Sequence, residues 1–503
     1  MPVFAAVDIG SNSVRLSIAE LRRGRLVTLH EDREVTRLGE GVFEDGNLDP
    51  KAMARTLKVL RRFHRAVQSH AVEQSRVVAT SALRDSNNGQ VFAELVKSVT
   101  GWKLEIISGH EEGRLIHLGV LSGMREPPPK LLLIDLGGGS CEVTLSIRGH
   151  VKDIISLPLG AVRLTHEFIR HDPPQKDELA RLRRFIAEES QRIPPQITRA
   201  GVGLAIATSG TAAALASAAQ SLKISRSSVP QDAIARLATR LAKMTQRQRA
   251  AIKGINTKRA EIIIAGAAVY AHLLEHCAIA GFRYSPIGLR DGLLAQMAAE
   301  YDQHTRSHRQ LQSDREDVLV NISRRYNVDT ANAEHVRKLA LSLFDQTRSM
   351  HQLDKDYRDW IATAATLYEV GAFINPAGRH RHAYYVISHS ELFGYTPLQR
   401  KLIATIARFQ GNSRPQLRDR LIKVVPPHLR TDVIKATAIL RLAKALNQGR
   451  RGAVHELRAN VRDGQVYVNL QAGRGGADLE LWAAEKEMPY FRGVFSRELV
   501  FRL

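Results

Sequence analysis

The sequence predicts a two-lobed α/β core, followed by an all-helical domain and a small C-terminal domain of mixed helices and strands. Two segments of one design, at residues 3–16 and 131–143, are the first observation. Each has a hydrophobic strand, then Asp, an aliphatic residue, Gly and a small-residue turn, then a second strand. Around them strands alternate with helices, which indicates an α/β layer. After about residue 301 helix follows helix, so a separate helical domain is expected.

The turn in each of these two segments is suited to binding an anion. Glycines lack a Cβ, so their backbone N–H groups can come close to a phosphate. The carboxylate at the strand end, Asp8 or Asp135, could hold a hydrated divalent cation against that phosphate. A plain hairpin explains either segment alone, because Asp-Gly turns join strands in many proteins. Two copies that head successive segments of similar size predict two facing lobes with phosphate between them.

The first lobe is expected over residues 1–124 and the second over 125–304, with a hinge at the proline-rich stretch 125–130. The helical domain is expected over 305–450, and the C-terminal domain, with its strand signal at 465–470, over 451–503. In the core we expect helices over 51–70, 91–99 and 262–274, and strands over 76–80, 103–107 and 203–207.

Composition narrows the class of protein. A chain of 503 residues is too long for one core, and roughly three or four domains are expected. The net charge of +22 and pI near 10.2 favour a polyanionic partner: nucleic acid, an anionic membrane or polyphosphate. Cys141 and Cys277 have no metal-ligand spacing, which favours a reducing, cytoplasmic location. The first apolar run contains Asp8 and is no signal peptide, and the apolar stretch 262–274 is too short to span a bilayer.

A Gly-His-Glu-Glu turn lies between the two Asp-Gly segments, where a strand ends and a helix begins. Glu111 and Glu112 would be favourable there simply as acidic residues at a helix N-terminus. Alternatively, one of them points into the interlobe cleft as a general base that deprotonates a water. Such a base contributes typically 10² to 10⁴ in rate.

Two further loops could bind phosphate. Arg84 follows a strand directly, and its guanidinium could hold phosphate oxygens in a bidentate manner, although it could equally be an ordinary loop arginine. The turn 208–211, Thr-Ser-Gly-Thr, combines hydroxyl groups, a glycine and a helix N-terminus. It is either an anion site or a helix cap.

The helical region is strongly basic over residues 407–451, with eleven Lys or Arg residues against only Asp419 and Asp432. A solvated helix face is one interpretation. The other is a surface along which a polyanion is held.

The motifs together resemble the exopolyphosphatase and guanosine pentaphosphate phosphohydrolase (Ppx/GppA) family, within the actin, sugar kinase and Hsp70 ATPase superfamily. The family's Asp-aliphatic-Gly-Ser-Asn-Ser turn stands at 8–13 and its Ile-Ser-Gly-x-Glu-Glu-x-Arg-Leu turn at 107–115. Its Ile-Asp-aliphatic-Gly-Gly-Gly-Ser-x-Glu loop stands at 134–142 and its Ser-Gly-Thr turn at 209–211. The resemblance implies an actin-like (ribonuclease H-like) two-lobed core with an HD-like helical domain.

The resemblance also implies roles for individual residues. Glu112 would activate the attacking water, and Asp135 and Glu142 would assist through magnesium, with Asp8 as a further metal ligand. A monovalent cation such as K⁺ is a possible second cofactor. The implied phosphate-binding residues are Asp8, Gly10, Ser11, Asn12, Ser13, Arg84, Gly137, Gly138, Gly139, Ser140, Ser209, Gly210 and Thr211.

In the HD-like domain, a working metal site needs an adjacent His-Asp pair with further His and Asp ligands. Here those positions are Tyr368 and Glu369, so no competent second metal site is expected, and His351 is expected to pack or to contact polyphosphate. Relatives are commonly dimers, which implies a homodimer. The expected polyphosphate track is His380, His382, Arg408, Arg414, Arg418 and Arg420.

The leading hypothesis is a magnesium-dependent exopolyphosphatase that releases orthophosphate from chain ends. The alternative within the family is removal of the terminal phosphate of guanosine pentaphosphate, for which the sequence reveals no base-binding contacts. A nucleic-acid-binding protein would explain the charge but leaves Asp8, Glu112 and Asp135 without a role. A kinase of the same superfold would need an adenosine pocket in the second lobe, and the turn 208–211 is compatible with one.

Overall fold

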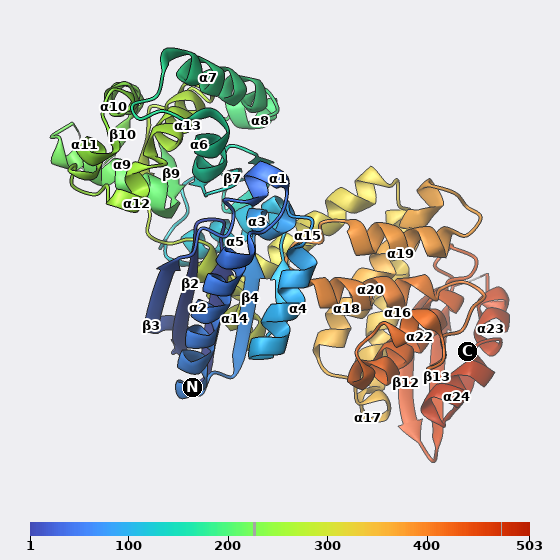
Figure 1. The fold of residues 1–503 in the computed structure, drawn as a ribbon. Helices are drawn as coiled ribbons and strands as arrows, with labels where there is room; N and C mark the ends of the chain where they lie inside the picture. Colours follow the sequence, from blue (N-terminus) through green and yellow to red (C-terminus); the bar gives the residue numbers. More distant parts are fainter. Residues whose placement is uncertain (225–227, 474, 503) are drawn as a thin grey trace. The chain divides into compact units, whose positions relative to one another are not determined.

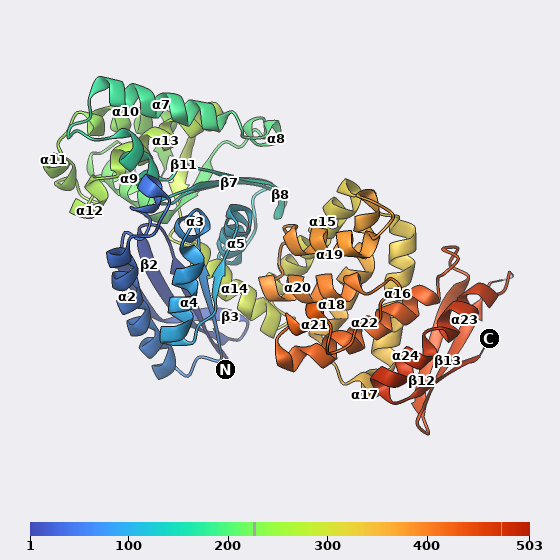
Figure 2. The same ribbon diagram turned by 45° about the vertical axis from the view of Figure 1, so that its right-hand side comes forward.

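The computed structural model describes residues 1–224, 228–473 and 475–502. Its first compact unit ends at Asp314 and contains two mixed α/β lobes, each built on one sheet (Figure 1). The second unit begins at Arg315 and is helical, with a small sheet near the C-terminus (Figure 2).

The division between the two units falls inside helix α15 (Arg306–Arg325). Gln310, in the first half of the helix, donates to the Gly149 carbonyl oxygen at 2.9 Å. Arg315, in the second half, donates to the Gly394 carbonyl oxygen at 2.9 Å. The helix therefore changes partners along its length. The boundaries at 124, 304 and 450 stay predictions.

The first lobe is a five-stranded sheet of order β3-β2-β1-β4-β5. Its strands are β1 (Val3–Ile9), β2 (Ser13–Arg22), β3 (Arg25–Val35), β4 (Gln74–Ala79) and β5 (Leu104–Ile106). The first three strands form an antiparallel meander, and β4 and β5 continue the sheet parallel to β1. Helices α2 (Pro50–Ser69) and α4 (Gly89–Thr100) connect the parallel strands and pack apolar residues against the sheet. The predicted strand and helix alternation is confirmed here.

The second lobe repeats this strand connectivity in a six-stranded sheet of order β10-β11-β9-β6-β7-β8. Its strands are β6 (Lys130–Leu136), β7 (Cys141–Ile147), β8 (His150–Leu157), β9 (Ala205–Thr208), β10 (Val229–Pro230) and β11 (Gly281–Tyr284). Again a meander of three strands comes first, and parallel strands are added beside the first of them. Asp8 and Asp135 therefore occupy equivalent positions, next to the last residue of β1 and of β6.

Helices cover the second sheet and return the chain to the first lobe. They are α6 (Ala161–Phe168), α7 (Lys176–Ser190), α9 (Ser209–Ser221), α10 (Gln231–Ala242), α13 (Ile263–His276) and α14 (Leu289–Tyr301). The predicted buried helix at 262–274 is α13, which packs in the core of the second lobe. Helix α14 packs instead with β1 and with α5 (Gly109–Ser122). Gly292 makes this crossing possible, since a Cβ there would lie 1.8 Å from the Leu115 carbonyl oxygen.

The second unit has one apolar core that joins its helices to a three-stranded sheet. Its longer helices are α16 (Thr330–Gln346), α18 (Asp356–Leu367), α19 (Arg379–His389), α20 (Pro397–Arg408), α22 (Arg430–Ala445), α23 (Asp478–Glu485) and α24 (Met488–Phe495). The sheet has the order β12 (Val454–Arg462), β13 (Gln465–Ala472), β14 (Glu498–Arg502). The expectation that strand structure begins only at residue 465 is wrong. Strand β12 was missed because charged residues on its solvent-facing side interrupt its apolar residues.

Within the described ranges, no helix has both the length and the apolar character needed to cross a bilayer. Cys141 and Cys277 are buried free thiols.

Candidate active site

In the second lobe, residues paired across neighbouring strands form an acidic row. The row runs over β9, β6, β7 and β8 and consists of Thr208, Asp135, Glu142 and Ser156. Directly paired residues project from the same face of a sheet. The Thr208 hydroxyl donates to Asp135 Oδ1, and the Ser156 hydroxyl donates to Glu142 Oε1 at 2.7 Å. Each carboxyl group of the row is therefore held by a hydroxyl from the strand beside it.

The first lobe has an equivalent row with a different charge. Asp8 on β1 pairs with Arg15 on β2, which pairs with Arg33 on β3. Burial raises the pKa of Asp8, while the nearby guanidinium groups of Arg15 and Arg290 act in the opposite direction. One lobe thus presents an acid flanked by cations, and the other presents two acids flanked by hydroxyl groups.

Helix α5 brings a third carboxyl group to the acidic row. A Cβ at Gly109 would lie 2.2 Å from Ser156 Oγ, and one at Gly113 would lie 2.9 Å from Thr144 Oγ1. Real Cβ atoms do not approach this closely, so glycine is required at Gly109 for the helix to lie against β7 and β8. Glu112 stands between these two glycines and is 7% exposed.

The two adjacent glutamates have separate environments. Ser108 is the N-cap of α5, since its side chain accepts from the Glu111 N–H at 3.1 Å. Glu111 binds the fully buried Arg114 through both carboxylate oxygens, at 2.8 Å each. Glu112 makes neither contact and is the carboxylate that faces the acidic row.

The carboxylate oxygens of Glu112, Asp135 and Glu142 lie within 4.8 Å of one another. Burial, and then the neighbouring carboxylates, raise the pKa of Glu112 well above its usual range and that of Glu142 to about 7. Burial also raises the pKa of Asp135, against the hydrogen bond from Thr208. In the described part of the chain, Glu112 Oε2 and Glu142 Oε2 are buried without a hydrogen-bond donor. Buried acceptor oxygens that lack donors fit a divalent cation, which prefers carboxylate ligands.

The metal-ligand set expected from the resemblance differs from this cluster in one member. Asp135 and Glu142 belong to both sets, whereas Asp8 lies outside the close cluster and Glu112 lies within it.

The glycine turn after β6 is oriented by the N-terminus of α6. The N–H groups of Ala161 and Val162 donate to the carbonyl oxygens of Gly137 and Gly138 at 3.0 and 2.8 Å. In a trans peptide unit the N–H points opposite to the C=O. The N–H groups of Gly138 and Gly139 therefore point away from α6, and successive N–H groups on one side form an anion-binding nest. Gly160 permits this contact, since a Cβ there would lie 2.2 Å from the Gly139 carbonyl carbon.

A cavity of about 500 Å³ lies between the two lobes. Four arginines from both lobes line it, Arg15, Arg33, Arg259 and Arg290. Burial, and then the charges of Arg33 and Arg15, lower the pKa of Arg259 to about 10. Clustered guanidinium groups, whose positive charge lowers the pKa of Arg259, form a site for an anion.

Most residues expected to bind phosphate or to take part in catalysis line this cavity. They are Asp8, Gly10, Ser11, Asn12, Ser13, Glu112, Asp135, Gly137, Gly138, Ser140, Ser209 and Gly210. The other expected residues are not among those that line the cavity. Glu142 is buried in the acidic row, and the Thr211 hydroxyl accepts from Arg259 at 3.2 Å. Gly139 packs against Ser81, and Arg84 Nη1 lies 3.6 Å from Glu112 Oε2.

The four cavity arginines were not identified as site residues from the sequence. Arg15 and Arg33 could have been found by pairing the predicted strands, because both lie in the row that contains Asp8. Arg259 and Arg290 come from distant segments, and only the packing of the two lobes brings them to the cavity.

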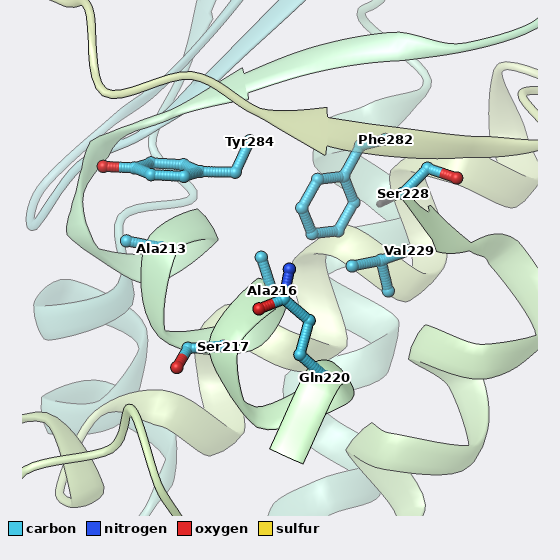
Figure 3. A pocket seen from close by; sticks show the side chains of 8 residues that line it. All are labelled: Ala213, Ala216, Ser217, Gln220, Ser228, Val229, Phe282 and Tyr284. Carbon is cyan, nitrogen blue, oxygen red and sulfur yellow. The ribbon is translucent and has the colours of Figure 1, made fainter. Parts of the chain in front are cut away.

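A second cavity of about 250 Å³ adjoins the first, and Ala213 and Tyr284 line both. Figure 3 shows Tyr284 and Phe282 side by side on one strand, facing residues of α9 that include Ala216. At its far end lies Gln220. The cavity is thus lined by the aromatic rings of Phe282 and Tyr284 and, opposite them, by residues of α9 that include two alanines.

In the second unit, the side chains at the HD-like position, Tyr368 and Glu369, form hydrogen bonds with other side chains of the protein. The Glu369 carboxylate accepts from Arg450 and, at 3.2 Å, from Asn332. The Tyr368 hydroxyl accepts from Asn332 at 3.0 Å. His351 is fully buried, and both of its ring nitrogens are paired with backbone groups.

The residues of the expected polyphosphate track differ in their burial and in their contacts. His380 is half-buried, and burial, then the charges of Lys444 and Arg379, lower its pKa to about 4. Arg408 lies near this group, since it contributes to the same shift. Arg414 instead donates to the Lys486 carbonyl oxygen at 2.6 Å. His382 is half-buried, and Arg418 and Arg420 are exposed.

Comparisons with known proteins agree with this description. The model of the Ppx/GppA phosphatase family matches residues 17–301, and that of Ppx/GppA phosphatase domain III matches residues 315–475. A crystal structure of an exopolyphosphatase from Cytophaga hutchinsonii is 26% identical with a TM-score of 0.55 and covers 59% of this chain and 98% of its own. A structure of the Aquifex aeolicus PPX-GPPA enzyme is 30% identical with a TM-score of 0.50 and covers 58% of this chain and 98% of its own. The predicted fold class, an actin-like two-lobed core with an additional helical domain and a small C-terminal domain, is confirmed.

The raised pKa of Glu142 generates a prediction about stability. Its pKa is about 7 in the folded protein against 4.5 ordinarily, so between these values the folded state binds more protons than the unfolded state. The free energy of unfolding contributed by this group therefore falls as pH rises through that window. We predict that, in the presence of a chelator, Glu142→Gln raises the Tm relative to wild type, and by more at about pH 8 than at about pH 5. Thermal unfolding followed by circular dichroism measures this difference.

Addition of Mg²⁺ is the matched control. We expect it to raise the Tm of wild type more at the higher pH, where the carboxylates are ionised, and to have a smaller effect on Glu142→Gln. A Tm difference between the two proteins that does not change with pH would contradict the assignment.

Proposed function

The chain belongs to the Ppx/GppA phosphatase family, whose members hydrolyse phosphate anhydrides, and we propose that it is a magnesium-dependent exopolyphosphatase. Its substrate would be inorganic polyphosphate, from whose ends it releases orthophosphate. The observation that supports this most directly is the charge distribution of the cavity. Glu112 and Asp135, two members of an acidic cluster that can hold a cation, line the same space as four arginines. A polyphosphate chain needs the cation at its reacting end and the arginines along its length.

The residues of this chain have separate roles in the proposed reaction. The nest at Gly138 and Gly139 would hold oxygens of the terminal phosphate, and the arginines of the cavity would hold the remaining chain. Asp135 and Glu142 are the residues that would hold Mg²⁺. When bound, the ion would neutralise charge on the phosphoryl oxygens and lower the pKa of the neighbouring carboxyl groups.

Glu112 is the proposed general base. It is the carboxylate of the cluster that comes from a helix rather than the sheet, and its Oε2 lies 3.6 Å from the Arg84 guanidinium. It would take the proton of a water as the water oxygen bonds to phosphorus. The bridging P–O bond then breaks, and the shortened chain leaves as its phosphate anion.

We predict that Glu112→Gln loses hydrolysis of long-chain polyphosphate by about 10² to 10⁴ in kcat while its affinity for the chain stays within about threefold. The amide keeps the shape of the side chain but cannot take the proton. Orthophosphate release and equilibrium binding, measured on the same preparations, check the two parts.

Glu111→Gln is not a neutral control, because Glu111 holds Arg114. Glu94→Gln, a change at an exposed position on α4, is the better one and is expected to match wild type. Retention of wild-type turnover by Glu112→Gln would exclude Glu112 as the base.

The basic surface of the second unit is proposed as the track for long chains. We predict that replacing Arg408, Arg418 and Arg420 with Gln lowers kcat/KM for long-chain polyphosphate about tenfold, but that for tripolyphosphate by less than about twofold. Arg414 is kept because its side chain binds the Lys486 carbonyl oxygen.

The control for charge is the same change at three exposed arginines of α7, Arg181, Arg183 and Arg184. It is expected to leave both substrates unaffected. Equal losses on long and short substrates in the first triple variant would show that this surface is no track.

A second candidate substrate is guanosine pentaphosphate, and the aromatic cavity favours it. The cavity continues from the phosphate cleft through Ala213 and Tyr284, so a phosphorylated nucleoside could place its ring against Tyr284. We predict that, if this is the substrate, Tyr284→Ala raises its KM about tenfold or more, because one stacked base contributes about 1–3 kcal/mol. Turnover of polyphosphate would stay within about twofold, since polyphosphate has no ring.

Steady-state kinetics with both substrates measure this difference. Tyr385→Ala, at an exposed tyrosine of the second unit, is the control. Equal effects of Tyr284→Ala on both substrates would remove the support for a nucleotide.

A further inference from the structure

The guanidinium group of Arg163 joins the two lobes beside the glycine turn. Arg163 stands in the first turn of α6, in the second lobe. Its Nε donates to the Gly139 carbonyl oxygen at 2.8 Å, and its Nη2 donates to Asp85 of the first lobe. The guanidinium also lies over the Phe43 ring of the first lobe, 4.4 Å from the ring centroid. A planar guanidinium can make these contacts together, whereas an ammonium group cannot.

One end of Arg163 completes the orientation of the nest. The carbonyl groups of Gly137 and Gly138 are held by backbone N–H groups of α6, and that of Gly139 is held by the Arg163 side chain. The N–H of Ser140 belongs to the same peptide unit as the Gly139 carbonyl and therefore points the opposite way. Ser140 lines the main cavity, so its N–H is the third member of the nest.

The other end of Arg163 reaches the surroundings of Glu112. Asp85 accepts from Arg163 and also lies 3.7 Å from Arg84 Nε. Arg84 in turn donates to the Ile107 carbonyl oxygen at 3.0 Å and lies 3.6 Å from Glu112 Oε2. Asp85 thus stands between two guanidinium groups, one fixing the nest and the other facing Glu112.

We propose that Arg163 is a positioning residue that aligns the phosphate-binding nest of one lobe with Arg84 and Glu112 of the other. This inference rests on the proposed phosphoanhydride hydrolysis. Arg163 does not line the cavity and acts through the Gly139 peptide and through Asp85. Its effect is on transition-state geometry, so we expect its loss to lower kcat more than it raises KM.

The test uses the full-length protein and compares wild type, Arg163→Ala and Arg163→Lys in polyphosphate hydrolysis with Mg²⁺. We expect kcat to fall about tenfold or more in both variants, as for a displaced oxyanion donor, with KM within about threefold. Because lysine keeps the charge but lacks the planar guanidinium group, it is expected not to restore kcat. Millimolar guanidinium chloride is expected to restore part of the kcat of Arg163→Ala and not that of Arg163→Lys.

Arg37→Ala is the matched control. Arg37 also joins the lobes, through an ion pair with Glu261 at 2.7 Å, but its side chain has no contact with the glycine turn. We expect it to keep kcat within about twofold. Equal kcat losses in Arg37→Ala and Arg163→Ala, full activity of Arg163→Lys, or no rescue by guanidinium would each overturn the proposal.

A second measurement separates this inference from the proposed substrate. Orthovanadate resembles the phosphoryl group during transfer, and its affinity can be measured by calorimetry without turnover. We expect Arg163→Ala to weaken it about tenfold or more and Arg37→Ala to leave it unchanged. If wild type does not hydrolyse polyphosphate, the proposed substrate is wrong, while vanadate binding still decides on Arg163. Equal vanadate affinity of wild type and Arg163→Ala overturns the positioning role.

Discussion

Three carboxyl groups within 4.8 Å of one another, those of Glu112 and Glu142 buried and that of Asp135 half-buried, are the constraint around which the first unit is organised. Each additional negative charge in a buried site raises the energy of ionising the others. The pairing of β6 with β7 is responsible for two of the three, because it sets Glu142 directly opposite Asp135. A slip of one residue in that pairing would move Glu142 to the other face of the sheet. The hydroxyl groups of Thr208 and Ser156 offset part of the cost, and they too are fixed by strand register.

Helix α5 adds the third carboxyl group and is itself held firmly. Gly109 and Gly113 allow it to lie on β7 and β8, and Gly292 allows α14 to lie across it. The buried Arg114 of α5 binds Glu111 and lies 3.4 Å from Asp314, so the helix is fixed from the side away from the acidic row. Two neighbouring residues of one turn therefore have different roles: Glu111 holds the helix in place through Arg114, and Glu112 lines the cavity.

Much of this arrangement could be predicted from the sequence, and the limits have physical causes. The two Asp-Gly segments indicated both hairpins, since a strand, a glycine turn and a strand are local features. The choice of Glu112 over Glu111 came from the resemblance, because a glutamate pair at a helix start does not reveal which member is paired with arginine. The acidic cluster with Glu112 in place of Asp8 depends on how α5 lies on the sheet.

Other features depend on contacts between distant segments. Arg259 and Arg290 reach the cavity only when the lobes pack, and Arg163 reaches Asp85 in the same way. In the second unit, the pairing of Glu369 with Arg450 could not be read from the Tyr-Glu pair alone. Strand β12 has charged residues along its exposed side, and only its pairing with β13 reveals it.

A crystal structure of the protein with Mn²⁺ and a non-hydrolysable imidotriphosphate, with the ion located by its anomalous scattering, tests the acidic cluster and the nest together. We expect an ion bound by Asp135 and Glu142, with the terminal phosphoryl group against the N–H groups of Gly138 and Gly139. The outer phosphates would lie toward the four cavity arginines. An ion elsewhere in the protein, with the acidic cluster and the nest both unoccupied, would contradict this expectation.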